Sequence, residues 1–254
     1  PFDFMCGNDL LSQLPEHLDH SSHRHGYNVF GCIDVAIEID YYTFQTFNSY
    51  EEAVNWALEM LAVADAIYLE EIELSITSNS AQIWEIEDPY SIFINEPQNM
   101  LIALRDSWIS DEELSSINRH LVHLFSKRNN TGTGGIAFLN GIGSSWSGYG
   151  FSSNLTDEED YVDLPVPYFF WNIYCLVHEL GHNFGSKHTQ WCGWPDGPID
   201  NCANIEEVVE GECSDYINNP APQVGTIMSY CHTWPFESGG GIIMKFDDYV
   251  KTTL

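Results

Sequence analysis

The chain has 254 residues, of which 44% are hydrophobic and 14% aromatic, and 38 acidic against eight basic residues give a formal net charge of −30 at pH 7. This composition predicts a globular protein with one large domain or two modest ones, and it excludes a disordered chain. The acidic balance excludes a nucleic-acid-binding surface, because such a surface requires a basic face. The sequence contains no apolar run of about eighteen residues, so no membrane span is predicted.

Residues 1–27 are polar and contain four closely spaced histidines. Such a cluster can bind a metal, but it is more often part of a solvated, irregular segment, and we expect a lead-in of that kind. Because the chain begins with Pro1 and shows no signal-like segment, we expect a trimmed piece of a longer precursor. Residues 28–254 are expected to form the folded domain.

The next two segments carry a strand pattern and then a helix pattern. Apolar and polar residues alternate from Cys32 onward within residues 28–42, which predicts a strand. Asn48 or Ser49 is expected to cap a helix that has glutamates in its first turn. Apolar residues recur at helical spacing to about residue 70, so this helix is predicted to be long.

Two short strands are predicted over residues 72–76 and 82–86. Further along, Ser110 is followed three residues later by Glu113, which is the pattern of a capping box. This pair predicts a short helix over residues 111–118.

Residues 121–126 predict a central strand, and a glycine-rich bend follows at residues 132–135. Glycine-rich loops can bind phosphate, but this one lacks the Gly-Lys-Ser/Thr ending of such a loop. A run of four acidic residues at 157–160 could hold Ca²⁺, although without the spacing of a known calcium loop it is more often a solvated surface.

Residues 168–183 predict a long apolar helix that leads into the motif H-E-x-x-H-x-x-G-x-x-H. On a helix His178 and His182 project from one face with about 5–6 Å between their Cβ atoms, so the two imidazoles can share one ion. Gly185 tolerates a positive φ and can end the helix sharply, which allows His188 to return to the same ion. Three histidine ligands with an open fourth position are typical of a catalytic zinc site.

Glu179 follows the first histidine and lies about 100° around the helix from it, so it faces the same region without competing for the metal. In that position a carboxylate can act as a general base toward water activated by zinc. The competing interpretation is a purely structural zinc site. Such a site normally closes its fourth position with Cys or His, and none is spaced for it here.

Four of the seven cysteines lie in the irregular segment after this motif, namely Cys192, Cys202, Cys213 and Cys231. A segment rich in Pro, Gly and Asn with little periodicity requires covalent links, so we expect two disulfides there and a secreted protein. Four cysteines can pair in three ways, and the nested pairing of Cys192 with Cys231 and Cys202 with Cys213 is preferred. Zinc capture by these cysteines is the competing interpretation, but no C-x-x-C pair is present.

The histidine motif is followed by G-T-I-M-S-Y-C, with Met228 about forty residues beyond His188. This order resembles the metzincin metalloendopeptidases, which carry a methionine in a tight turn beneath the zinc. The sequence H-E-L-G-H-N-F-G and the cysteine-rich segment after it are most similar to the adamalysin/reprolysin group. Two positions differ from that group: Thr189 replaces an aspartate, and Thr226 replaces a cysteine.

The resemblance implies an α/β, metzincin-like zincin fold with a mixed twisted sheet, long helices above the cleft and an irregular, disulfide-tied C-terminal subdomain. It divides the catalytic domain into an upper part of about residues 28–185 and a lower part of about residues 186–254. Residues 135–140 resemble the edge strand that pairs with an extended substrate in metzincins. Ala137 and Phe138 are the expected contact residues in that strand.

The resemblance further implies a secreted, zinc-dependent endopeptidase that acts on proteins or peptides, and we expect a monomer. Tyr230 matches a tyrosine that astacins and serralysins place near the zinc, where its hydroxyl ligates the metal or stabilises the oxyanion, although a tyrosine in a turn is often only packed. Cys6, followed by glycine, resembles a propeptide cysteine that ligates and blocks the zinc; a disulfide or an idle thiol explains it equally well.

Two alternatives therefore remain open beside the active endopeptidase. One is a catalytically silent metzincin-like binding module, which the intact Glu179 disfavours. The other is a latent form in which the Cys6 thiolate occupies the zinc.

Overall fold

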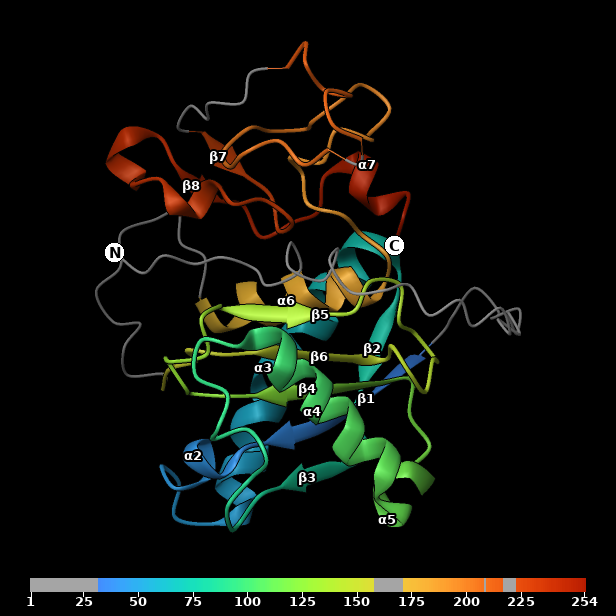
Figure 1. Cartoon of the computed structure of the whole chain (residues 1–254), viewed down its shortest axis with the longest axis vertical. Coiled ribbons are helices and arrows are strands. Elements are labelled where there is room, and N and C mark those ends of the chain that lie inside the picture. Colours follow the sequence, from blue (N-terminus) through green and yellow to red (C-terminus); the bar gives the residue numbers. More distant parts are fainter. Residues whose placement is uncertain (1–31, 158–170, 208, 217–222) are drawn as a thin grey trace.

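The structure is a computed structural model that describes residues 32–157, 171–207, 209–216 and 223–254. Its centre is a mixed, six-stranded sheet with the order β2-β1-β4-β6-β5, in which β3 also pairs with β1 (Figure 1). The pairs are parallel, except that the edge strand β5 runs antiparallel to β6. The strands are β1 Cys32–Ile39, β2 Ser75–Thr77, β3 Ala81–Ile83, β4 Leu121–Phe125, β5 Gly135–Ala137 and β6 Tyr149–Ser152.

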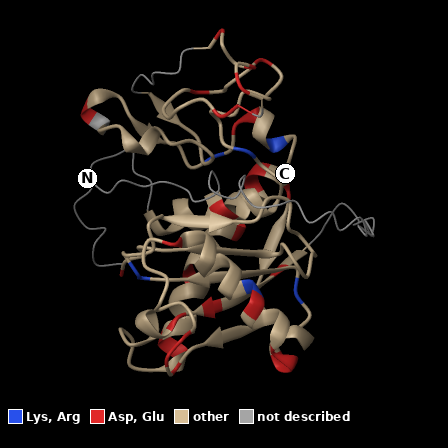
Figure 2. Cartoon of the chain, viewed as in Figure 1, with Lys and Arg blue, Asp and Glu red and all other residues tan. Residues whose placement is uncertain are grey.

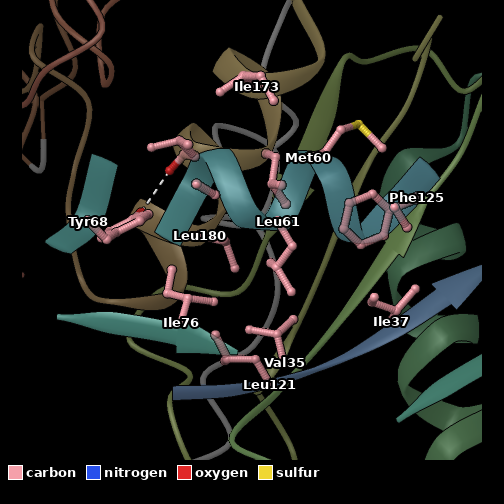
Figure 3. Packing of buried hydrophobic residues seen from close by; sticks show 14 of the residues in the cluster. Val35, Ile37, Met60, Leu61, Tyr68, Ile76, Leu121, Phe125, Ile173 and Leu180 are labelled. Carbon is pink, nitrogen blue, oxygen red and sulfur yellow. Dashed lines mark hydrogen bonds between the residues drawn. The ribbon is translucent and has the colours of Figure 1, made fainter. Parts of the chain in front are cut away.

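Alternate residues of β1 pack on opposite faces of the sheet, as expected for a strand buried on both sides. Val35 packs with helices α3, Tyr50–Ile72, and α6, Trp171–Asn183 (Figure 3). Ala36 packs on the other side, with helix α4, Pro97–Ser110. The sheet is therefore the middle of three layers, and the expected α/β fold is confirmed. The predicted central strand at residues 121–126 is β4.

Helix α3 begins at the predicted cap. The side chain of Ser49 accepts a hydrogen bond from the Glu52 N–H at 3.2 Å, while the Asn48 N–H donates to the Glu52 carboxylate at 2.9 Å. The helix continues to Ile72 and ends at Glu73, which has a left-handed φ of 58°. The strand predicted over residues 72–76 begins too early, because residue 72 belongs to the last turn of α3 and the strand β2 starts at Ser75.

Helix α4 is present in the structure but was not predicted from the sequence. Pro97 lies in its first turn, where the absent N–H removes no helical hydrogen bond. Met100, Leu104 and Trp108 are fully buried at helical spacing. This proline and this spacing are the signals that identify the helix.

The next helix, α5, spans Glu112–Ser116 and is shorter than predicted. Asp111 caps it by accepting hydrogen bonds from the N–H groups of Glu113 and Leu114 at 2.8 and 2.9 Å. The predicted cap, Ser110, is instead the last residue of α4, so the capping-box assignment is wrong by one residue.

The C-terminal part is mostly irregular and lies on the side of α6 and β5 (Figure 1). Its short strands β7 and β8 are parallel, and the short helix α7 follows them near the end of the chain. The remaining short elements are α2 Tyr41–Phe44, β7 Val224–Gly225, η2 Cys231–Thr233, η3 Phe236–Ser238, β8 Gly241–Ile242 and α7 Asp248–Lys251.

The two predicted disulfides are present in this part, but the nested pairing is wrong. Cys192 bonds to Cys213, and Cys202 bonds to Cys231. Cys231 is fully buried directly after the methionine turn, in the same apolar cluster as Cys202, whose carbonyl accepts a hydrogen bond from Trp234 Nε1 at 3.0 Å. The turn therefore brings Cys231 to Cys202, and this leaves Cys192 to pair with Cys213.

Acidic residues are spread over the ribbon, whereas Lys and Arg are few (Figure 2). Several of the basic residues are engaged by carboxylates: Arg105 with Asp106, Lys127 with Asp157, Arg128 with Asp40 and Asp88, and Lys251 with Glu71. Residues 158–160 of the acidic run lie outside the described residues. Among the described helices, none has the length and apolar character needed to cross a membrane.

Glu38 is a fully buried carboxylate in β1. Trp84 Nε1 donates a hydrogen bond to it at 2.7 Å, and the Tyr90 hydroxyl and Trp108 Nε1 donate to it as well. Burial nevertheless raises the pKa of Glu38 from its ordinary value of 4.5 to about 7, because the apolar surroundings disfavour the charge more than the three donors stabilise it.

This pKa shift predicts a stability that depends on pH. Between about pH 4.5 and pH 7 the folded state keeps a proton that the unfolded state has lost, so the free energy of unfolding falls as pH rises through that window, by roughly 3 kcal/mol. Glu38→Gln has no such proton. In urea titrations, wild type should therefore lose roughly 3 kcal/mol of stability relative to this variant between about pH 4.5 and pH 8. An equal difference at both pH values would contradict the shift.

Candidate metal centre

Helix α6 carries the first two predicted ligands, and the turn after it returns the third. The ligand nitrogens of His178, His182 and His188 all lie within 4.8 Å of one another, and the three side chains are buried. The helix ends at Asn183, and Gly185 has a φ of 113°, a value that favours glycine over any residue with a Cβ. The Gly185 N–H then bonds to the His182 carbonyl at 2.9 Å, which closes the turn toward His188.

Each of the three imidazoles is oriented through its Nδ1 atom. Nδ1 of His178 lies 2.8 Å from the Ile227 carbonyl, and Nδ1 of His182 lies 2.8 Å from the Ser186 carbonyl. Nδ1 of His188 lies 2.6 Å from the Glu206 carboxylate. An acceptor at Nδ1 places the ring proton there and makes the Nε2 lone pair the donor to a metal.

The donor set therefore fits zinc. The Nε2 atoms of His182 and His188 are only 3.0 Å apart, so they converge on one point. Burial, and secondly the neighbouring His188, hold the pKa values of His178 and His182 well below the ordinary value. These two rings are thus neutral at pH 7, which is the form that binds a metal.

Glu179 is fully buried beside the histidines. Its carboxylate lies against the edge strand, because a Cβ added at Gly135 would be 2.5 Å from Glu179 Oε1. The acid therefore lies between the metal ligands and β5.

Met228 lies directly beneath α6. A Cβ added at Gly181 would be 2.6 Å from the Met228 sulfur, so this glycine allows the close approach. The Met228 carbonyl accepts a hydrogen bond from the Thr189 N–H at 3.0 Å. The carbonyl of the preceding residue, Ile227, accepts the hydrogen bond from His178 Nδ1. The methionine turn thus supports both the first ligand and the segment that carries the third.

The hydroxyl of Tyr230 also reaches the centre. It lies 3.1 Å from His188 Nε2, and the side chain is 4% exposed. A phenol in this position can hydrogen-bond a group bound at the metal. Cys6 lies outside the described residues.

The edge strand is attached to the end of α6. Asn183 Nδ2 donates to the Phe138 carbonyl at 2.8 Å and to the Tyr149 carbonyl at 3.1 Å. Ala137 is fully buried, whereas Phe138 is half-buried. Any contact of a peptide with Ala137 would therefore involve its backbone. The sequence reasoning missed Asn183, although its place directly after the second ligand is a signal for such a role.

A mixed α/β sheet with three converging histidines on and after one helix, and a buried glutamate beside the first, defines a zinc metallopeptidase. A sequence model of the reprolysin type, described as metallo-peptidase family M12, matches residues 32–238, and the chain belongs to this family. The resemblance to reprolysin-type metzincins is thereby confirmed. Membership implies zinc as the metal and proteins as substrates.

Two individual proteins are similar to parts of this chain. The snake venom metalloproteinase trimerelysin-2 of Protobothrops flavoviridis is 24% identical over 157 residues, which is 61% of this chain and 72% of that protein. A solved structure described as a chaperone–substrate complex matches 62% of this chain and 24% of its own chain, with 15% identity and a TM-score of 0.45. The second likeness is too weak to support a functional argument.

Proposed function

We propose that this protein is a secreted endopeptidase that hydrolyses internal peptide bonds, with zinc held by His178, His182 and His188. Glu179 is the general base in this proposal. The observation that carries it is the convergence of three imidazole nitrogens beside a buried carboxylate that is not one of the ligands. A silent binding module would have no need of that carboxylate.

When bound, zinc supplies a Lewis acid that polarises a peptide carbonyl and makes water acidic enough to react at neutral pH. Glu179 takes the proton from the attacking water and passes it to the leaving amine nitrogen. The hydroxyl of Tyr230 donates a hydrogen bond to the carbonyl oxygen as negative charge develops on it. Because the region around both side chains is buried, these interactions act in a low dielectric.

The substrate lies along the edge strand β5 at Ala137 and Phe138 and pairs through the backbone of Ala137, because the Phe138 N–H already donates to the Tyr149 carbonyl and the Phe138 carbonyl accepts from Asn183. An edge strand offers N–H and C=O groups to an extended peptide, and such pairing is largely independent of the peptide's side chains. The position of Glu179 against Gly135 supports this arrangement, because the base then faces the bound backbone.

Two disulfides support a secreted protein, since such bonds persist outside the reducing cytosol. We further propose that the domain acts as a monomer with upper and lower parts of about residues 28–185 and 186–254. Calcium binding at residues 157–160 stays a prediction, and Asp157 already pairs with Lys127. Inhibition by Cys6 stays a prediction as well.

Incubation of the purified chain with an unfolded protein tests the endopeptidase. We expect new internal N-termini, detected by mass spectrometry, which disappear after treatment with a chelator and return when zinc is added. Removal of terminal residues alone, or cutting that survives loss of the metal, would contradict the proposal. A latent form would instead show activity that rises after treatment with a thiol-blocking reagent.

A further inference from the structure

Glu206 is the only charged side chain among the three Nδ1 partners described above. His188 Nδ1 donates to Glu206 Oε1 at 2.6 Å, whereas His178 and His182 donate to backbone carbonyls. A carboxylate is the stronger acceptor, because a hydrogen bond to an ionised group is shorter and stronger than one between neutral groups. The third ligand is therefore held differently from the other two.

The backbone of Glu206 is fixed next to the segment that follows His188. Its N–H donates to the Gln190 carbonyl at 3.1 Å, and its carbonyl accepts from the Cys192 N–H at 3.0 Å. Trp191 and Glu206 form an isolated parallel bridge. These contacts place the Glu206 carboxylate beside the His188 imidazole, from which it accepts a hydrogen bond.

The side chain of Glu206 is also oriented, since Gln190 Nε2 donates to the same Oε1 atom at 2.7 Å. Its side chain is 25% exposed, so the charge keeps part of its hydration. The disulfides Cys192–Cys213 and Cys202–Cys231 fasten the loop that carries it on both sides. The loop that carries the Glu206 carboxylate is thus restrained by both covalent links.

We propose that Glu206 is a positioning residue for the metal centre, which orients His188 and strengthens it as a zinc ligand. The inference rests on the proposed zinc site. The carboxylate fixes the proton on Nδ1, directs Nε2 to the metal and makes the imidazole a better electron donor. His188 is the ligand that most needs such support, because it lies beyond the helix and on a segment without regular structure.

The test compares Glu206→Ala and Glu206→Gln with Glu210→Gln, which neutralises an exposed acid of the same loop. Each purified protein is loaded with zinc, and the rate of zinc loss to a chelating dye is followed. We expect Glu206→Ala to lose zinc about 10–100-fold faster than wild type, and Glu206→Gln to be intermediate because its amide oxygen still accepts. Glu210→Gln should match wild type.

Thermal unfolding of the zinc-loaded and metal-free forms separates positioning from a merely structural role. If Glu206 acts through the metal, Glu206→Ala should lower the Tm of the loaded protein and leave that of the metal-free protein nearly unchanged. An equal loss in both forms, or zinc retained as in wild type, would overturn the inference. A wild-type protein that binds no zinc would instead overturn the proposed function itself.

Discussion

Glu179→Gln is expected to lower kcat/KM by about 10⁴-fold, at the upper end of what general acid–base catalysis contributes. Glutamine has nearly the same shape as glutamate, but its amide cannot take a proton from water or pass one to the leaving nitrogen. The Nδ1 contacts that orient His178, His182 and His188 do not involve this side chain. Zinc content, measured by elemental analysis, should therefore stay at one ion per chain while turnover of a fluorogenic peptide is lost.

The matched control is Glu113→Gln, which removes one carboxylate from the exposed surface of α5. Its activity should equal that of wild type, which excludes an effect of net charge. Normal turnover in Glu179→Gln would remove Glu179 from the mechanism. Loss of zinc together with activity would assign Glu179 to metal binding instead.

The part of the site that the sequence predicts is the part that is local. The helical repeat fixes the relative directions of His178, Glu179 and His182, and the need for a positive φ at Gly185 follows from the return of the chain toward His188. The same holds for α3, whose cap and apolar spacing lie within the helix itself. In each case, sequence neighbours determine the geometry.

The parts that could not be predicted depend on contacts between distant segments. Glu206 contacts His188 from a loop that two crossed disulfides and a backbone bridge hold, and the pairing of Cys202 with Cys231 depends on where the methionine turn lies. Neither contact has a periodicity or a fixed spacing in the sequence. Helix α4 differs from these, because Pro97 and the buried positions after it were readable signals.

Gly135→Ala is expected to lower kcat by about 100-fold without loss of zinc. The added Cβ would lie 2.5 Å from Glu179 Oε1 and 2.6 Å from its Cγ, so the carboxylate must move. A displacement of about 1 Å is enough for such a loss, because proton transfer requires hydrogen-bond distance in the reacting complex. Steady-state kinetics and elemental analysis of the variant measure both effects.

A double-mutant cycle shows whether the methyl group acts through Glu179 or through the strand. In the wild-type background, Gly135→Ala should lower the free energy of unfolding by about 1–3 kcal/mol, because it overpacks a buried region. In the Glu179→Ala background the clashing atoms are gone, so Gly135→Ala should then cost almost nothing in urea unfolding. The same cost in both backgrounds would place the effect in β5 itself, and full activity of the single variant would show that the carboxylate has room to move without leaving its working position.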